Sequence, residues 1–297
     1  MPRRHLLCAA ALAVALPLAG CTSSGDPGPL PPPPTGPDFR LVAYDSCEQL
    51  EKDLKQAAKA SVSPYGFPGA GGIPEVVNAE GGARTMAQTG NAAVPGDTAA
   101  APDAYSGTNN HERDADEPDI VKTDGRRIVT VAGGTLRVVD AASRQRTGEV
   151  SLGIFGGTEP TLLLSGDSAL VLVSGERTQA ILVGLGGAPT VVSRWEGDGR
   201  LVDARMTAGT VRVVLRSAPD IAFPMKATEP SGQLEDNRGA IDDAPLDAWL
   251  PSWSVTTNGT TDKGQAECGK VTRPPEFSAG SLLSLLTFDL ARPALGS

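Results

Sequence analysis

The hydrophobic pattern from Asp119 onward consists of short β-branched runs separated by glycine turns. Examples of these runs are IVKT, RRIVTVA, TLRVVDA, PTLLLSG, SALVLVSG and TVRVVLRS. The turns at Asp124-Gly125, Gly166-Asp167 and Ala208-Gly209 each precede an apolar run, and their glycines lie 41 and 43 residues apart. A repeat of about 42 residues that contains about four strands has the size of one blade of a β-propeller. The pattern therefore predicts an all-β chain of about three four-stranded blades.

Several of the predicted strands are apolar at consecutive positions, as at 161–164 and 169–173. A sheet with one wet face would alternate apolar and polar residues, so both faces of these strands should be covered, as they are between stacked blades. A β-sandwich also has short strands and frequent turns, and periodicity alone leaves that alternative open. The repeat stops at Ser217 and LLSLLTFDL resumes it, which predicts an inter-strand insertion at 217–275 with short helical turns around Gln233 to Ile241.

The region before the repeats contains one helical pattern. Apolar residues recur at helical spacing from about Cys47 to Ala60, and Ser46 and Gln49 are spaced as a capping box. We expect residues 41–61 to form a helix that packs on the propeller. Residues 62–104 are rich in glycine, proline and alanine without a period, which predicts a disordered linker.

The amino terminus has the organisation of a bacterial lipoprotein signal. Two arginines precede an apolar run that is too short to span a membrane, and Leu18-Ala19-Gly20 then precedes Cys21. This pattern predicts a signal peptide at 1–20 and lipidation of Cys21, although an ordinary signal peptide could also contain a cysteine. Residues 21–40 are rich in proline and should form an extended tether that reaches roughly 50 Å.

The cysteine count predicts one disulfide. The chain has four cysteines. Cys8 leaves with the signal peptide and Cys21 takes the lipid, so Cys47 and Cys268 are the thiols that remain in an oxidising compartment.

Several stretches resemble a known family in the same order along the chain. They are SCEQL (46–50), YSGTNNHERDADEPDIVKTDG (105–125), GRLVDARM (199–206), AWLPSW (248–253) and RPPEFSAG followed by LLTFDL. The chain resembles the secreted bacterial β-propeller domain family that is distantly related to WD repeats, and the resemblance is collinear from about residue 41 to the end. It implies an exported β-propeller lipoprotein, and it implies no particular reaction because the function of the family is uncharacterised.

The propeller of that family continues beyond the length of this chain. We therefore expect residues 105–297 to form an incomplete propeller domain. Its first and last blades should each have an uncovered outer face, and one strand edge should be unpaired.

The stretch that leads into the first predicted strand is strongly acidic. Five carboxylates surround His111, and they belong to Asp114, Asp116, Glu117, Asp119 and Asp124. A calcium loop needs ligands at alternate positions and a glycine at its sharp turn, but here Pro118 takes the third ligand place and Glu117 to Asp119 supply no glycine. The spacing predicts a hydrogen-bonded lead-in loop, with no metal site.

Other motifs give no catalytic or cofactor site. His111 is the only histidine after the signal peptide, so a multi-histidine metal site is excluded, and no Gly-x-Ser-x-Gly motif occurs. GAGGIP and GLGGAP have proline where a dinucleotide loop has its last glycine. Trp195, Trp249 and Trp253 could form a ligand platform, but buried tryptophans more often serve packing.

The charge composition argues against one class of partner, the nucleic acids. The formal net charge of −9 and the sequence pI near 4.8 disfavour nucleic-acid binding.

We expect a lipid-anchored envelope protein without catalysis, located at the cell membrane or cell surface. It would bind or scaffold an envelope protein or glycan and reach the membrane only through its lipid. The alternative is an exported propeller hydrolase or lyase acting on envelope polymers, with Asp116 or Asp119 as an acid.

Overall fold

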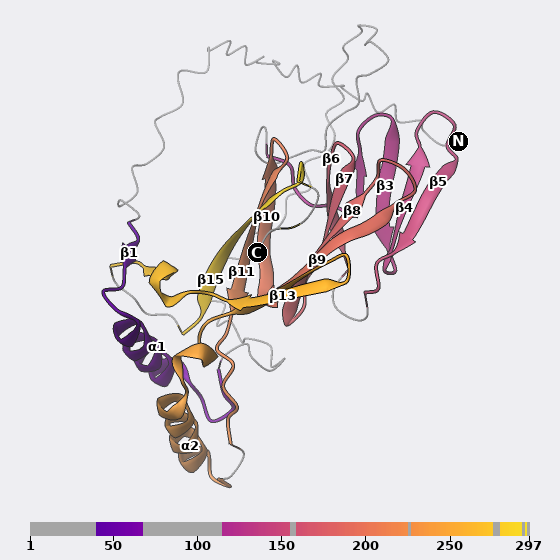
Figure 1. Ribbon diagram of the computed structural model, residues 1–297. Coiled ribbons are helices and arrows are strands. Elements are labelled where there is room, and N and C mark those ends of the chain that lie inside the picture. The colour runs from indigo at the N-terminus through magenta and orange to yellow at the C-terminus, as the bar shows by residue number, and fades with distance from the viewer. Residues whose placement is uncertain are drawn as a thin grey trace, which may run out of the picture. The chain divides into compact units, whose positions relative to one another are not determined.

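The computed structural model describes residues 40–67, 115–154, 159–224, 227–275, 280–292 and 295 (Figure 1). The predicted signal peptide, Cys21, most of the predicted tether, and nearly all of the linker predicted at 62–104 lie outside the described residues.

Three antiparallel sheets form the blades of a partial propeller, and strand is the main secondary structure, as predicted. The first blade contains β2 (Val121–Thr123), β3 (Arg127–Ala132), β4 (Thr135–Asp140) and β5 (Arg146–Ser151). The second contains β6 (Thr161–Ser165), β7 (Ser168–Val173), β8 (Arg177–Gly184) and β9 (Thr190–Asp198). The third has three described strands, β10 (Arg200–Thr207), β11 (Thr210–Ser217) and β15 (Leu282–Asp289).

The repeated glycine turns occupy equivalent places in the three blades. Gly125, Gly166 and Gly209 lie between the first and second strands of successive blades, and their φ angles are 84°, 52° and 79°. Glycine adopts this left-handed backbone conformation without the steric cost that a Cβ would add. The turn spacing therefore marks the blade repeat.

Two apolar clusters fill the interfaces between neighbouring blades, and the second blade contributes to both. One cluster joins the first two blades and contains Val129, Leu136 and Leu152 with Leu162, Val171 and Ile181. The other joins the second and third blades and contains Leu163, Leu170 and Leu182 with Val213, Leu215 and Phe288. Because β7 faces a cluster on each side, its residues from Ala169 to Val173 are all buried. This explains the apolar residues at consecutive positions.

The insertion between β11 and β15 has its own secondary structure. It contains α2 (Pro230–Asp243), η1 (Leu246–Ala248), β12 (Ser252–Thr257), β13 (Thr260–Gln265), η2 (Cys268–Lys270) and β14 (Thr272–Arg273). The sequence predicts only short helical turns here, whereas α2 is one helix of 14 residues. The hairpin of β12 and β13 pairs with β9 and extends the second blade to six strands, in the order β13-β12-β9-β8-β7-β6.

The amino-terminal elements contact this insertion. The short strand β1 (Val42–Ala43) pairs with β14, and α1 (Cys47–Ser61) follows it. The N-cap of the predicted capping box is present, because Gln49 N donates to Ser46 Oγ at 3.2 Å. The return bond is shifted by one residue, since it is Asp45 N that donates to Gln49 Oε1, also at 3.2 Å.

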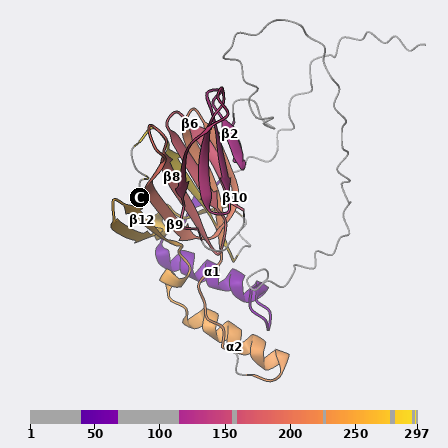
Figure 2. The same cartoon turned by 90° about the vertical axis from the view of Figure 1, so that its right-hand side faces the viewer.

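The buried side of α1 joins an apolar cluster with residues of the insertion, which places α1 and α2 next to each other at one end of the sheets (Figures 1 and 2). Its members include Leu50, Leu54, Ala58, Ile241, Ala244, Trp249 and Leu250. The sequence predicts that this helix packs on the propeller, and in the structure the helix packs on the insertion of the third blade.

Candidate functional site

The acidic lead-in segment, defined here as residues 115–120, crosses the first strands of the blades. Asp116 exchanges two backbone hydrogen bonds with Met206 of the third blade, at 2.8 and 2.9 Å. Asp119 does the same with Leu162 of the second blade, at 3.1 and 2.6 Å. The Ile120 carbonyl then accepts from Val131 N of the first blade at 2.9 Å. The segment therefore ties three blades together through its backbone.

The side chains of the lead-in segment strengthen these ties. Asp116 Oδ1 lies 2.7 Å from Lys122 Nζ, and the lysine side chain is only 4% exposed. Glu117 Oε1 lies 3.2 Å from Nη2 of Arg205, which belongs to the third blade. Asp119 Oδ1 accepts a hydrogen bond from Ile120 N at 2.7 Å. The three described carboxylates of this segment are thus engaged within the propeller.

The structure does not describe every residue of the predicted acidic cluster. Asp114 and His111 lie outside the described residues. Within the described part of the chain, no group of three or more His, Cys, Asp or Glu side chains is arranged to hold a metal ion. The geometry of the described carboxylates matches a structural lead-in loop.

Asp124 belongs to a second inter-blade contact that the sequence did not reveal. Its Oδ1 accepts from the backbone N–H groups of Arg126 and Arg127, at 3.0 and 2.9 Å. Partial burial raises the pKa of the Asp124 carboxyl, but these hydrogen bonds and the two guanidinium charges outweigh it, so the pKa lies below its usual value. Arg127 also pairs with Asp167 at 3.0 Å and donates to the Gly166 carbonyl. The turn of the first blade is thereby joined to the matching turn of the second.

The three tryptophans serve packing in this structure. Trp195 is 5% exposed and meets Phe288 edge-on, with ring centroids 5.9 Å apart. Trp249 is 3% exposed inside the cluster shared with α1. The indole of Trp253 covers Gly264 of the neighbouring strand so closely that a Cβ there would overlap it. The tryptophans do not form a common ligand platform.

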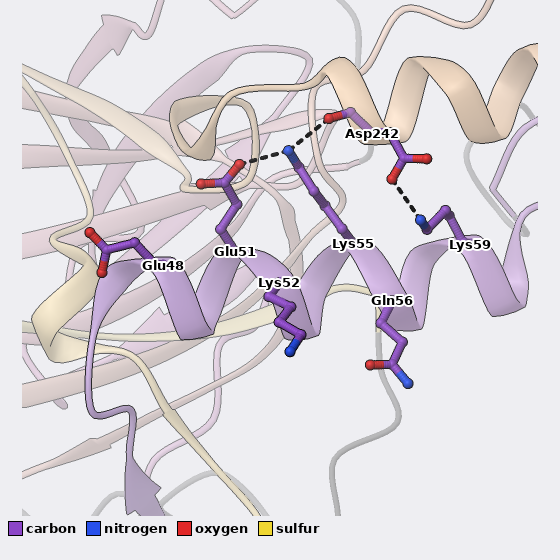
Figure 3. Close-up of a pocket in the computed structure, with 7 residues that line it drawn as sticks. All are labelled: Glu48, Glu51, Lys52, Lys55, Gln56, Lys59 and Asp242. Carbon is purple, nitrogen blue, oxygen red and sulfur yellow. Dashed lines mark hydrogen bonds and ion pairs between the residues drawn. The ribbon is translucent and has the colours of Figure 1, made fainter.

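A groove of about 460 Å³ lies between α1 and α2 (Figure 3). Lys55 Nζ is 2.6 Å from Glu51 Oε1 and donates to the Asp242 carbonyl at 2.9 Å. Lys59 Nζ is 2.6 Å from Asp242 Oδ1. Figure 3 shows Glu51, Lys55, Lys59 and Asp242 directed at one another, whereas Lys52 and Gln56 point away from α2. The side of the groove that faces α2 is therefore charge-paired.

A second hollow of about 710 Å³ lies between α2 and residues 220–224. Its wall contains Asp220, Glu235, Asp236 and Asp243 together with small alanine, glycine and proline residues. Among the described residues, no ion pair neutralises these four carboxylates. The sequence predicts no site there, because these acids are spread over two separate segments.

Large apolar side chains are exposed on the first and third blades. Ile120 is 54% exposed and Val121 is 42% exposed beside the first blade. On the third blade Val202, Leu283 and Leu285 are 57%, 70% and 66% exposed. These are the blades on which the sequence predicts uncovered faces.

The disulfide predicted from the cysteine count is present. Cys47 and Cys268 are joined with a Cα–Cα distance of 5.6 Å. This bond connects the first residue of α1 to the first residue of η2. It spans 221 positions of sequence, so it links the amino-terminal helix covalently to the insertion.

None of the helices in the described ranges has both the length and the apolar character needed to cross a bilayer.

Comparison with known proteins supports the fold. A family model described as the beta propeller domain matches residues 105–296, a range that contains the lead-in segment, the three blades and the insertion. No curated protein and no solved structure matches the chain. Because the family model covers more than half of the chain, the protein belongs to the beta propeller domain family.

Proposed function

We propose that the protein is a lipid-anchored, exported β-propeller that acts as a binding or scaffolding protein of the cell envelope. The observation that favours a binding role over catalysis is that the carboxylates of the acidic lead-in segment are bonded within the protein. The Asp116 carboxylate pairs with Lys122 and that of Glu117 with Arg205 of the third blade, whereas the Asp119 carboxylate accepts from the adjacent backbone N–H. The backbone of the same segment bonds to the second and third blades. A general acid must instead face the substrate and exchange a proton with it.

The fold is suited to binding because it presents rigid blade surfaces with exposed apolar side chains. Leu283 and Leu285 stand on a three-stranded sheet whose opposite face is fixed in the apolar core. Apolar patches of this kind, surrounded by polar residues, are typical of protein interaction surfaces. An envelope protein or glycan is the proposed partner.

The binding and enzymatic alternatives can be separated with envelope polymers. The purified chain is incubated with isolated envelope material, and both retained protein and released soluble fragments are measured. Saturable retention without fragment release is the expected result. If the chain releases fragments and Asp119→Asn abolishes that release while leaving the thermal unfolding temperature unchanged, the protein is a hydrolase or lyase.

Export and lipidation rest on the amino-terminal sequence and on the disulfide. Small residues precede Cys21 directly, and a proline-rich tether follows it. The bond between Cys47 and Cys268 is typical of an oxidising compartment outside the cytosol.

Replacing Cys21 tests the lipid anchor. Cys21→Ser should move the protein from the detergent phase into the aqueous phase or leave its leader uncleaved. Cys8→Ser is the matched control, because it changes a cysteine within the predicted leader and should leave partitioning unchanged. Detergent partitioning and processing of Cys21→Ser that equal those of the unaltered chain would contradict lipidation.

A further inference from the structure

The two cysteines of the disulfide begin helical elements of very different length. Cys47 is the first residue of α1, which has 15 residues, and Cys268 is the first residue of η2, which has three. Both residues are half-buried, so neither is enclosed in the core away from an external thiol. The surroundings of each sulfur therefore decide how the bond reacts.

Contacts on either side of the bond hold its two halves together without it. Val42 and Ala43 pair with β14, only a few residues from Cys47 and from Cys268. The guanidinium of Arg273 lies 5.2 Å from the centre of the Tyr44 ring. When the disulfide is reduced, these contacts should keep the two thiols close, which gives them a high effective concentration for re-oxidation.

The apolar cluster supports the same conclusion. Leu50 and Leu54 are buried against the insertion at 0% and 1% exposure, and Cys268 packs against the same cluster. Breaking one covalent bond leaves this burial in place. The reduced protein should therefore keep α1 docked.

The two sulfurs differ in their ability to carry negative charge. The first backbone N–H groups of an α-helix have no partner within the helix, and together with the helix dipole they stabilise an anion at that end. At the same helix end, hydrogen bonds from its own backbone N–H and from the Ser46 side chain lower the pKa of the Glu48 carboxyl. A thiolate on Cys47 occupies the same helix end.

Charged groups near the pair belong to both elements. Asp45 and Glu48 oppose a thiolate on Cys47, but both are exposed to solvent, which weakens their effect. Beside Cys268, Glu267 precedes the sulfur and is paired with Lys270 at 3.1 Å. A single turn of three residues provides little dipole, so Cys268 lacks the stabilisation available to Cys47.

We propose that the disulfide is a reversible redox couple with a fixed direction, in which an external dithiol attacks Sγ of Cys268 and Cys47 leaves. The attacking thiolate forms a new S–S bond to Cys268, and the electron pair of the broken bond goes to Sγ of Cys47. The second thiol of the dithiol then attacks the mixed disulfide, which releases Cys268 as a thiolate and oxidises the dithiol. Two electrons pass from the dithiol to the protein, and water supplies protons to whichever thiolates become protonated.

The partner for this reaction is a protein dithiol of the compartment that holds the chain. This chemistry belongs to the folded chain and does not depend on the proposed binding role. A chain that binds no envelope component would leave the redox proposal intact, and the reverse also holds.

Trapping the mixed disulfide tests the direction of attack. The full chain with Cys8→Ser and Cys21→Ser is exposed to limiting glutathione in the presence of iodoacetamide, and its peptides are mapped by mass spectrometry. Glutathione should be found on Cys268 and the alkyl group on Cys47, in roughly three- to tenfold excess over the opposite arrangement. An equal or opposite distribution, or no reaction before denaturant is added, would overturn the proposal.

Alkylation of single cysteines tests the cause of that direction. In the same background, Cys268→Ser leaves Cys47 alone and Cys47→Ser leaves Cys268 alone. The pH midpoint of alkylation should be lower for Cys47 than for Cys268 by about one unit or more. Equal midpoints, or a lower one for Cys268, would show that the helix end does not select the leaving sulfur.

Re-oxidation tests the contribution of the surrounding contacts. After reduction and removal of the dithiol, oxidised glutathione should re-form the bond in the folded chain at least about tenfold faster than in urea. Equal rates in the two conditions would show that β1, β14 and the apolar cluster do not hold the thiols together.

Discussion

Replacing Asn237 should release the turn that follows α1. Asn237 is fully buried on α2, and its Nδ2 donates to the carbonyls of Ser63 at 2.9 Å and Pro64 at 3.2 Å. Its Oδ1 accepts from Gln233 Nε2 at 2.8 Å. Leucine has a similar size but offers none of these bonds, so Asn237→Leu leaves two carbonyls and one amide N–H without this partner. Each buried polar group that loses its partner costs about 1–3 kcal/mol. Because the Ser63 carbonyl still accepts from Gly66 N and the other partners are partly buried, we expect a loss of about 2 kcal/mol.

Hydrogen exchange followed by mass spectrometry measures this loss where it occurs. Peptides covering α2 and residues 62–67 should exchange faster in Asn237→Leu, while peptides of β7 and β8 should be unchanged, because local stability differs between cooperative units. Arg238→Leu is the matched control, since Arg238 is the exposed neighbour on the same helix and its substitution should change stability by less than about 0.5 kcal/mol. If Asn237→Leu and Arg238→Leu exchange alike, the buried amide does not hold the turn.

Two further substitutions test packing and charge in the blades. Gly264→Ala places a Cβ inside the indole of Trp253 and should cost about 1–3 kcal/mol of unfolding free energy, whereas Gly269→Ala meets no atom within 4 Å and should be close to neutral. Thermal unfolding checks both, and equal melting temperatures would reject the overlap. The lowered pKa of Asp124 means that its ionised form stabilises the fold above its unfolded pKa of about 3.9, and that this contribution disappears as the pH falls through the folded value. The stability difference between the unaltered chain and Asp124→Asn should therefore be largest near pH 7 and shrink toward pH 2; a difference that does not vary with pH would refute this.

The blades could be predicted from the sequence because their signals are local. Gly125, Gly166 and Gly209 have positive φ, so the turn residues appear directly as a repeat in the sequence. The consecutive apolar residues of β7 follow from a blade that is covered on both faces. Turn chemistry and burial of this kind are encoded within a few residues of each position.

The helix α2 was harder to predict because its buried side is partly polar. Gln233 and Asn237 take two of its three buried positions, and Ile241 takes the third. Apolar periodicity, which is the main signal for an amphipathic helix, is therefore weak along this stretch. The buried amide of Asn237 hydrogen-bonds to the turn after α1, which lies more than 170 positions away in the chain, and the Gln233 amide donates to Asn237. The role of this polar pair therefore depends on tertiary structure.

Two other features had no local signal. The strand β13 has the sequence TTDKGQ and is largely exposed, so it lacks the alternation that marks a strand. Arg127 connects Asp124 to the Gly166 turn of the next blade, and nothing near it in the sequence distinguishes it from other surface arginines. Both features depend on contacts between elements that are brought together only in the folded protein.

The insertion links two blades that already share an apolar interface. It leaves the third blade after Ser217, and its strand β12 then pairs with β9 of the second blade over the range from Trp253 to Thr257. The insertion reaches β12 through residues 218–251, so it tethers the third blade to the second in addition to the buried side chains that they share. The disulfide from Cys268 to α1 adds a covalent restraint to the same region. The second and third blades therefore have a cross-strand support that the first blade lacks among the described residues, and the first blade depends on its apolar interface, the lead-in segment and side-chain contacts such as that of Arg127.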